Sequence, residues 1–169
     1  MTEPRTLVLL RHAKAEGFAG SDEARPLAVA GRRQATAVGQ ALQASGPVPD
    51  AALVSSAVRT RQTWELLASG LTAPPEPELL DDLYDATARS ALDLVRHVEP
   101  DVRTLLVVGH EPVMSSLALL LAGPGSIDLH QVSAGIPTAT RCVLTLEGPW
   151  AELGRQGAAL TAVVRTPHE

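Results

Sequence analysis

The sequence predicts a single-domain, three-layer α/β/α sandwich with a mostly parallel sheet and an antiparallel edge strand. Apolar runs rich in Leu and Val at 6–10 and 104–108 stop at polar residues or glycine, as buried parallel strands do. Segments with helical spacing alternate with strand-like segments over most of the chain, which is the pattern of an α/β fold. The last two strand-like segments arrive without a helix long enough for a clear crossover, so we expect the antiparallel edge there.

The expected strands are short apolar runs bounded by polar residues, glycine or proline. In chain order they cover residues 5–10, 50–54, 78–80, 104–108, 141–146 and 158–164. Glycine, proline and polar residues make 16–27 a loop, and 73–77 is a loop with polyproline character. The second loop is too short and too isolated to count as a linker. No domain boundary stands out along the 169 residues, so we expect one domain over residues 1–169.

The expected helices lie between these strands. The first covers 28–45, where apolar residues recur at roughly helical spacing before a Ser-Gly-Pro stop. Ser55 or Ser56 is expected to cap a second helix that runs to about residue 69. A third covers 88–97, and Pro112 opens the last one, to about residue 122, at the first-turn position that proline tolerates.

Composition excludes several classes of protein. The formal net charge of −5 argues against a nucleic-acid partner or an acidic membrane surface. The N-terminus lacks the features of a signal peptide, and no apolar run approaches the ~20 residues of a membrane span. We therefore expect a cytoplasmic protein. Cys142 is the only cysteine, which rules out an intrachain disulfide, and it is expected to be buried filler in a strand.

Polar side chains follow two of the core strands at the point where each strand ends. Arg11 and His12 follow the first strand, and His110 follows the strand at 104–108 across a single glycine. In open α/β sheets, ligands bind at the carboxyl edge of the strands. A histidine there can be purely structural, but a guanidinium at the end of a buried strand needs an anion to offset its desolvation. Glu111 can pair with the helix dipole or with His110 without any catalytic role.

A further arginine lies near the start of the second expected helix. Arg59 falls in the first turn, where the helix dipole disfavours a cation. An anion bound at that end of the helix would remove the conflict, because free N–H groups and Arg59 could both coordinate it. The alternative is that Arg59 points into water.

These motifs together resemble those of the histidine phosphatase superfamily, in its phosphoglycerate-mutase-like branch. LLRHAKA at 9–15 is similar to the first-histidine signature of that family, with Ala13 where many members have glycine. SSAVRTRQT at 55–63 resembles the second-arginine motif, and VGHEP at 108–112 resembles the second-histidine motif. The segment DEARPL at 22–27, with the Gly and Gln-Ala that follow it, is similar to small SixA-type phosphohistidine phosphatases.

The resemblance implies a role for each matching residue. His12 would be the nucleophile that accepts the phosphoryl group, and Arg11, Arg59 and His110 would bind its oxygens. A protonated His110 would add positive charge, and the positive field would lower the pKa of His12 and keep it neutral for attack. No cofactor is expected and no metal, because the arginines supply the charge and no acidic cluster has metal-ligand spacing.

The proton donor is sought among the acidic residues of LDDLYD at 80–85. Asp82 falls nearest the family position and is the candidate general acid; the alternative is a solvated acidic turn. Some SixA-type members resemble this chain in having no clear acid. That fits a phosphohistidine substrate, because its leaving imidazole can already carry a proton.

The expected function is a metal-independent phosphatase that works through a phosphohistidine intermediate on His12. A phosphohistidine on a protein is the preferred substrate, and a small phosphoester is the alternative. A phosphoglycerate mutase is disfavoured because the short stretch from Arg59 to His110 leaves little chain for a lid. A non-catalytic phosphate-binding module is disfavoured because binding alone would need only the arginines.

Overall fold

A single mixed sheet organises the computed structural model, which describes residues 3–167. The sheet has six strands in the order β3-β2-β4-β1-β5-β6. Their bounds are β1 (Arg5–Arg11), β2 (Ala51–Ser55), β3 (Glu78–Leu80), β4 (Thr104–Gly109), β5 (Arg141–Leu146) and β6 (Ala159–Val164). The β1, β2, β3 and β4 strands are parallel, whereas β5 pairs antiparallel with β1 and β6 pairs antiparallel with β5.

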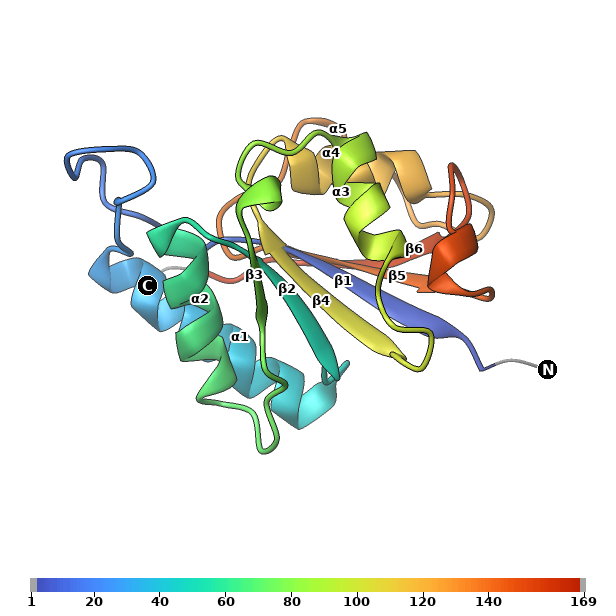
Figure 1. Cartoon of the computed structure of the whole chain (residues 1–169), viewed down its shortest axis with the longest axis horizontal. Coiled ribbons are helices and arrows are strands. Elements are labelled where there is room, and N and C mark those ends of the chain that lie inside the picture. The colour runs from blue at the N-terminus through green and yellow to red at the C-terminus, as the bar shows by residue number, and fades with distance from the viewer. Residues whose placement is uncertain (1–2, 168–169) are drawn as a thin grey trace.

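Helices cover both faces of this sheet (Figure 1). One face carries α1 (Val29–Ser45) and α2 (Val58–Ala68), and the other carries α3 (Ala88–Arg96), α4 (Val113–Leu121) and the short α5 (His130–Ser133). The predicted α/β/α sandwich with an antiparallel edge is therefore confirmed. The sequence did not indicate α5 or the short 3₁₀ helices η1 (Asp81–Leu83) and η2 (Trp150–Glu152).

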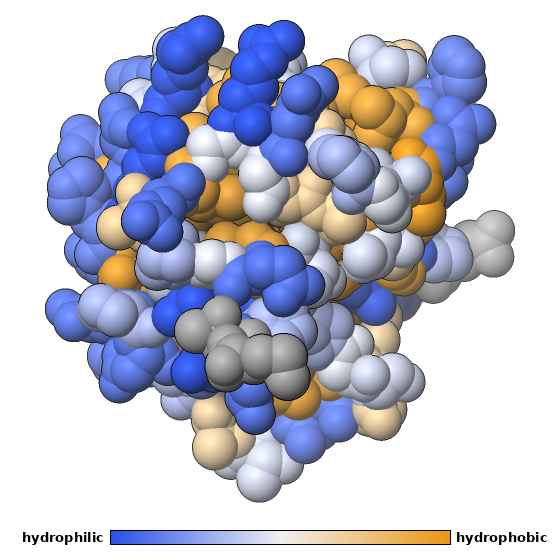
Figure 2. Space-filling view, turned by 90° about the vertical axis from the view of Figure 1, so that its right-hand side faces the viewer, coloured by the Kyte–Doolittle hydropathy of each residue, from blue (hydrophilic) through white to orange (hydrophobic). Residues whose placement is uncertain are grey.

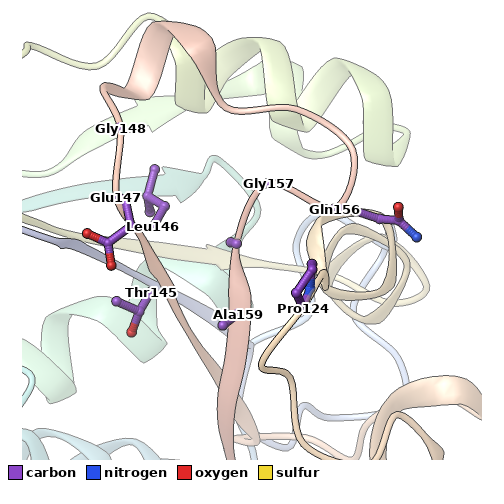
Figure 3. Close-up of a pocket in the computed structure, with 9 residues that line it drawn as sticks. Pro124, Thr145, Leu146, Glu147, Gly148, Gln156, Gly157 and Ala159 are labelled. Carbon is purple, nitrogen blue, oxygen red and sulfur yellow. The ribbon is translucent and has the colours of Figure 1, made fainter.

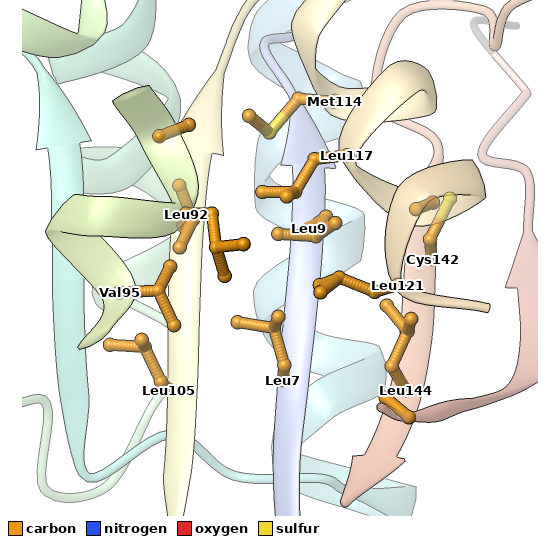
Figure 4. Packing of buried hydrophobic residues seen from close by; sticks show 14 of the residues in the cluster. Leu7, Leu9, Leu92, Val95, Leu105, Met114, Leu117, Leu121, Cys142 and Leu144 are labelled. Atoms are coloured by element: carbon orange, nitrogen blue, oxygen red, sulfur yellow. The ribbon is translucent and has the colours of Figure 1, made fainter. Parts of the chain in front are cut away.

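The side chains of β1 alternate between two hydrophobic cores. Leu7 and Leu9 pack with α3, α4 and β5 on one face, where Leu92, Leu117 and Cys142 meet them (Figure 4). Val8 and Leu10 belong to the second core, beneath α1 and α2. A strand with apolar side chains on both faces reads as a continuous hydrophobic run, which is why the sequence signal for β1 is strong.

Close packing of α1 on α2 depends on a glycine. A Cβ placed on Gly39 would lie 2.1 Å from the carbonyl oxygen of Leu67, so only a residue without a side chain fits. This contact allows the close approach of α1 and α2, and the first turn of α2 carries Arg59.

Two details at helix starts differ from expectation. The N-cap of α2 is Ala57, with no side-chain capping bond, so neither Ser55 nor Ser56 caps it. Ser55 is instead the last residue of β2, where its hydroxyl has another partner. Pro112 lies at the N-cap of α4 rather than inside its first turn. Cys142 is fully buried, and burial raises the pKa of its thiol to about 12.

A surface hollow of about 320 Å³ lies at the end of the sheet where β1 begins. Pro124 and the segments 145–148 and 156–159 line it (Figure 3). Because Leu146 pairs with Arg5 at the amino end of β1, this hollow lies away from the carboxyl edge of the parallel strands. Hydrophilic side chains, with hydrophobic ones between them, cover the face on the side where β1 begins (Figure 2). Within residues 3–167, no helix is long and apolar enough to cross a membrane.

Candidate active site

The two histidines meet because β1 and β4 end side by side. Arg11 and Gly109 are partners in the parallel ladder, so His12 and His110 leave the sheet at the same edge. The backbone N–H of His12 donates to the Gly109 carbonyl at 3.0 Å. The two imidazole rings have centroids 5.5 Å apart and are each less than a tenth exposed. The carboxyl edge of the sheet therefore presents a pair of buried imidazoles.

The start of α2 is fixed to the loop that follows β1. The Thr63 hydroxyl donates to the Arg59 carbonyl at 2.7 Å and accepts the Ala13 N–H at 3.0 Å. The Thr60 hydroxyl donates to the carbonyls of Ser55 and Ala57. These bonds hold the first turn of α2 against Ala13, the residue after His12. Arg59 therefore lies at the same edge of the sheet as the histidines, where it is 7% exposed.

The His12 ring is held by the backbone of the next residue, Ala13. Its Nδ1 lies 2.8 Å from the Ala13 carbonyl oxygen, which can only accept, so Nδ1 carries a proton and Nε2 is left free in the neutral ring. The pKa of His12 is lowered to about 3, first by burial and then by His110, which is itself protonated at so low a pH, and by the charges of Arg59 and Arg11, against the opposing effect of the Ala13 bond. At neutral pH, Nε2 therefore has a lone pair available for attack.

His110 is neutral as well. Burial, followed by the nearby Arg59, lowers its pKa to about 4, and the Asp22 carboxylate opposes the shift. The sequence suggested that a protonated His110 could add positive charge, whereas a pKa of about 4 leaves the ring neutral at neutral pH. The expected cause of the low His12 pKa also needs correction, because burial contributes more than the positive field. The Ser55 hydroxyl lies 2.7 Å from Nε2 of His110.

Asp22 is a neighbour of the site that sequence reasoning missed. Both terminal nitrogens of Arg59 donate to it: one to its carbonyl at 2.8 Å and one to its carboxylate at 3.0 Å. The Tyr84 hydroxyl donates to the same carboxylate oxygen at 2.5 Å. The Tyr84 bond, then Arg25 and Arg59, hold the pKa of Asp22 well below its usual range. The sequence signal that could have identified Asp22 is its place in the segment at 22–27 that resembles SixA-type proteins.

Tyr84 joins this cluster from the segment after η1. Its ring meets the His110 ring edge-on, with centroids 5.5 Å apart, and its centroid lies 5.9 Å from the guanidinium carbon of Arg59. Its hydroxyl bond to Asp22 raises the pKa of Tyr84, so it stays protonated at neutral pH. The aromatic ring and the Asp22 carboxylate together fix the orientation of Arg59.

Arg11 and Glu111 are both hydrogen-bonded to the backbone of Ile136. Arg11 donates to the Ile136 carbonyl at 2.9 Å, while burial lowers its pKa and Glu111 opposes that shift. The Glu111 carboxylate accepts the N–H groups of Ser115 and Ile136. It therefore stabilises the start of α4, one of the roles expected for it, and makes no hydrogen bond to His110. A hollow of about 410 Å³ beside Arg11 is lined also by Arg165.

Asp82 lies in η1 and is exposed. Among residues 3–167, no hydrogen bond or ion pair joins its carboxylate to Arg11, His12, Arg59 or His110. Over the same residues, no group of three His, Cys, Asp or Glu side chains is arranged to hold a metal ion. The side chains gathered at this edge of the sheet include two imidazoles and two guanidiniums, which suit the binding of an oxyanion.

A buried neutral imidazole beside arginines at the carboxyl edge of an α/β sheet is an arrangement suited to an enzyme that binds and transfers phosphate. Residues 7–87 match the model of the histidine phosphatase superfamily, branch 1. An uncharacterized protein of Mycobacterium tuberculosis is 40% identical over 157 residues, which cover 89% of this chain and 96% of that protein. The chain belongs to the histidine phosphatase superfamily and is a phosphatase of the hydrolase class.

Solved structures with the same fold include candidate phosphohistidine phosphatases named SixA. The one from Nakamurella multipartitia has a TM-score of 0.87 and 36% identity and covers 97% of both chains. The one from Agrobacterium tumefaciens has a TM-score of 0.80 and 27% identity, over 97% of this chain and 99% of that one. The predicted resemblance to this superfamily, and to SixA-type members within it, is confirmed.

Proposed function

We propose that this phosphatase removes the phosphoryl group from a phosphohistidine side chain of a protein, through an intermediate on His12. The free Nε2 of the neutral, buried His12 ring carries the proposal. Nε2 attacks phosphorus, and the bond from phosphorus to the substrate imidazole breaks as that ring leaves with the proton it already holds. Water then attacks phosphorus, the bond to His12 breaks, and inorganic phosphate leaves.

Arg11, Arg59 and His110 are the proposed ligands of the transferring group. Phosphoryl transfer spreads negative charge over three equatorial oxygens, so catalysis is mainly positioning and electrostatic stabilisation. Asp22 uses one N–H of each terminal nitrogen of Arg59, and a guanidinium has five N–H donors in all. The Nε of Arg59 and the Nε of Arg11 are buried and have no partner among the described residues, so both side chains keep donors for phosphate oxygens.

A phosphohistidine substrate suits the acid–base inventory of the site. Both histidines have a low pKa, Tyr84 has a raised one, and Asp82 is exposed in η1. None of these groups is a strong proton donor at the centre of the site. An imidazole leaving group needs no such donor, whereas an alkoxide does. The similarity to SixA structures supports the same substrate.

The test measures inorganic phosphate released from three substrates: a phosphohistidine-bearing protein, an activated aryl phosphate and an alkyl phosphoester. We expect the phosphohistidine protein to be turned over fastest. His12→Asn is the matched variant, because it keeps a side chain that can donate to the Ala13 carbonyl but has no nucleophilic nitrogen. It should abolish turnover and prevent acid-labile labelling of the enzyme by radioactive phosphate. A high rate on the alkyl ester, with none on phosphohistidine, would select the small-phosphoester alternative.

A further inference from the structure

The hydrogen bonding of His110 is unequal at its two nitrogens. Nε2 lies 2.7 Å from the hydroxyl oxygen of Ser55, at the end of β2. Nδ1 is buried and has no partner among the described residues. Ser55 is fully buried, and in the described chain His110 is the only partner of its hydroxyl group. Nε2 of His110 is therefore occupied by Ser55, whereas Nδ1 has no partner among the described residues.

The shared proton can lie on either partner of this bond. If Nε2–H donates to Ser55, the hydroxyl hydrogen is left in a buried position without an acceptor, and Nδ1 faces its surroundings as a bare lone pair. If the Ser55 O–H donates to Nε2, every hydrogen of the pair is used and Nδ1 becomes an N–H donor. Because a buried hydroxyl hydrogen without an acceptor is destabilising, the second arrangement is favoured.

The surroundings of His110 favour the same arrangement. Arg59 and Arg11 both lie close enough for their charge to act on this ring, and the His12 ring is its immediate neighbour. An anion held by those arginines would be repelled by a lone pair on Nδ1 and attracted by an N–H. The buried nitrogen without a partner among the described residues is then available to donate to a phosphoryl oxygen.

We propose that Ser55 is a positioning residue: its hydroxyl donates to Nε2 of His110, fixes the Nδ1–H tautomer and so presents an N–H donor to the phosphoryl group. The inference rests on the proposed phosphate-binding role of His110 and adds a residue to it. Ser55 touches neither substrate nor nucleophile. It acts through the His110 ring. Residues that orient metal-binding histidines act in the same indirect way, and mutating them typically lowers metal affinity or activity by about 10–100-fold.

The first test reads the tautomer directly. Nitrogen NMR of protein labelled at histidine distinguishes a protonated from a bare ring nitrogen, and His110→Gln assigns the signals. At neutral pH, we expect wild-type His110 to carry its proton on Nδ1 and the Ser55→Ala protein to lose that preference. A wild-type ring protonated on Nε2 would overturn the proposal, and this measurement needs no substrate and no folded variant of Ser55.

The second test reads function. Ser55→Ala should lower kcat/KM by roughly 10–100-fold and weaken inhibition by vanadate, and Ser55→Thr, which retains the hydroxyl, should recover most of the loss. Ser56→Ala is the matched control, because it removes a neighbouring hydroxyl that bonds to neither histidine. Equal activity in Ser55→Ala and wild type would refute the role. If no phosphorylated substrate is turned over at all, the proposed function fails, while the tautomer and vanadate binding still test Ser55.

Discussion

The buried histidines should make this fold sensitive to mild acid. In the unfolded chain, a histidine takes up a proton near pH 6.5, but in the fold His12 and His110 resist it until about 3 and about 4. As pH falls through 6.5, the unfolded state therefore binds more protons than the folded state. The stabilisation is fully present above pH 6.5 and is progressively lost below it.

The size of the loss follows from the distance between these values. One pH unit corresponds to about 1.4 kcal/mol for each proton. Between pH 6.5 and pH 5, each ring contributes about 2 kcal/mol, because both folded pKa values lie below pH 5. We expect the free energy of unfolding to be about 4 kcal/mol lower at pH 5 than at pH 8. For a domain of ordinary stability this is a large fraction of the total.

Denaturant titrations at several values of pH from 5 to 8 measure this effect. Phosphate and other oxyanions are kept out of the buffers, since an anion bound at the site would raise both pKa values. His12→Asn should halve the loss, to about 2 kcal/mol, whereas His97→Gln, which removes an exposed imidazole at the end of α3, serves as the matched control. A wild-type profile that is flat from pH 8 to pH 5 would refute the argument, as would a His12→Asn profile as steep as wild type.

Further predictions concern the ligands, the acid, the metal and the packing. Arg59→Ala should weaken inhibition by vanadate and slow turnover by about 2–4 kcal/mol of transition-state stabilisation; unchanged inhibition would remove Arg59 from the pocket. Asp82→Asn should slow an alkyl phosphoester by ~10²–10⁴-fold if Asp82 is the acid and leave phosphohistidine hydrolysis nearly unchanged; small equal effects would make it a surface residue. Activity should survive EDTA, and a loss restored by a divalent ion would contradict the mechanism. Gly39→Ala should lower the free energy of unfolding by about 1–3 kcal/mol, because its Cβ would overlap the Leu67 carbonyl; Gln40→Ala, on the exposed side of α1, should not.

The order of strands and helices could be predicted because their signals are local. An apolar run such as 6–10 indicates a strand with apolar side chains on both faces, and helical spacing is an equally local pattern. The placement of Arg11, His12 and His110 at one edge followed from the rule that parallel strands end on the same side of a sheet. The helix caps were less predictable, because a serine near the start of a helix cannot act as a cap when its hydroxyl is hydrogen-bonded elsewhere. The Ser55 hydroxyl is hydrogen-bonded to Nε2 of His110.

By itself, the sequence determined the fold class, the edge at which the site lies and the four residues that matched a known set of motifs. Only the tertiary structure decided which protonation states those residues have and which side chains orient them. Asp22 meets Arg59 and Tyr84 across long stretches of chain, and Ser55 meets His110 in the same way. Such pairs depend on how the strands and loops lie against one another, which no local pattern records. The low pKa of each histidine has the same origin, because burial is a property of the assembled core and not of neighbouring residues.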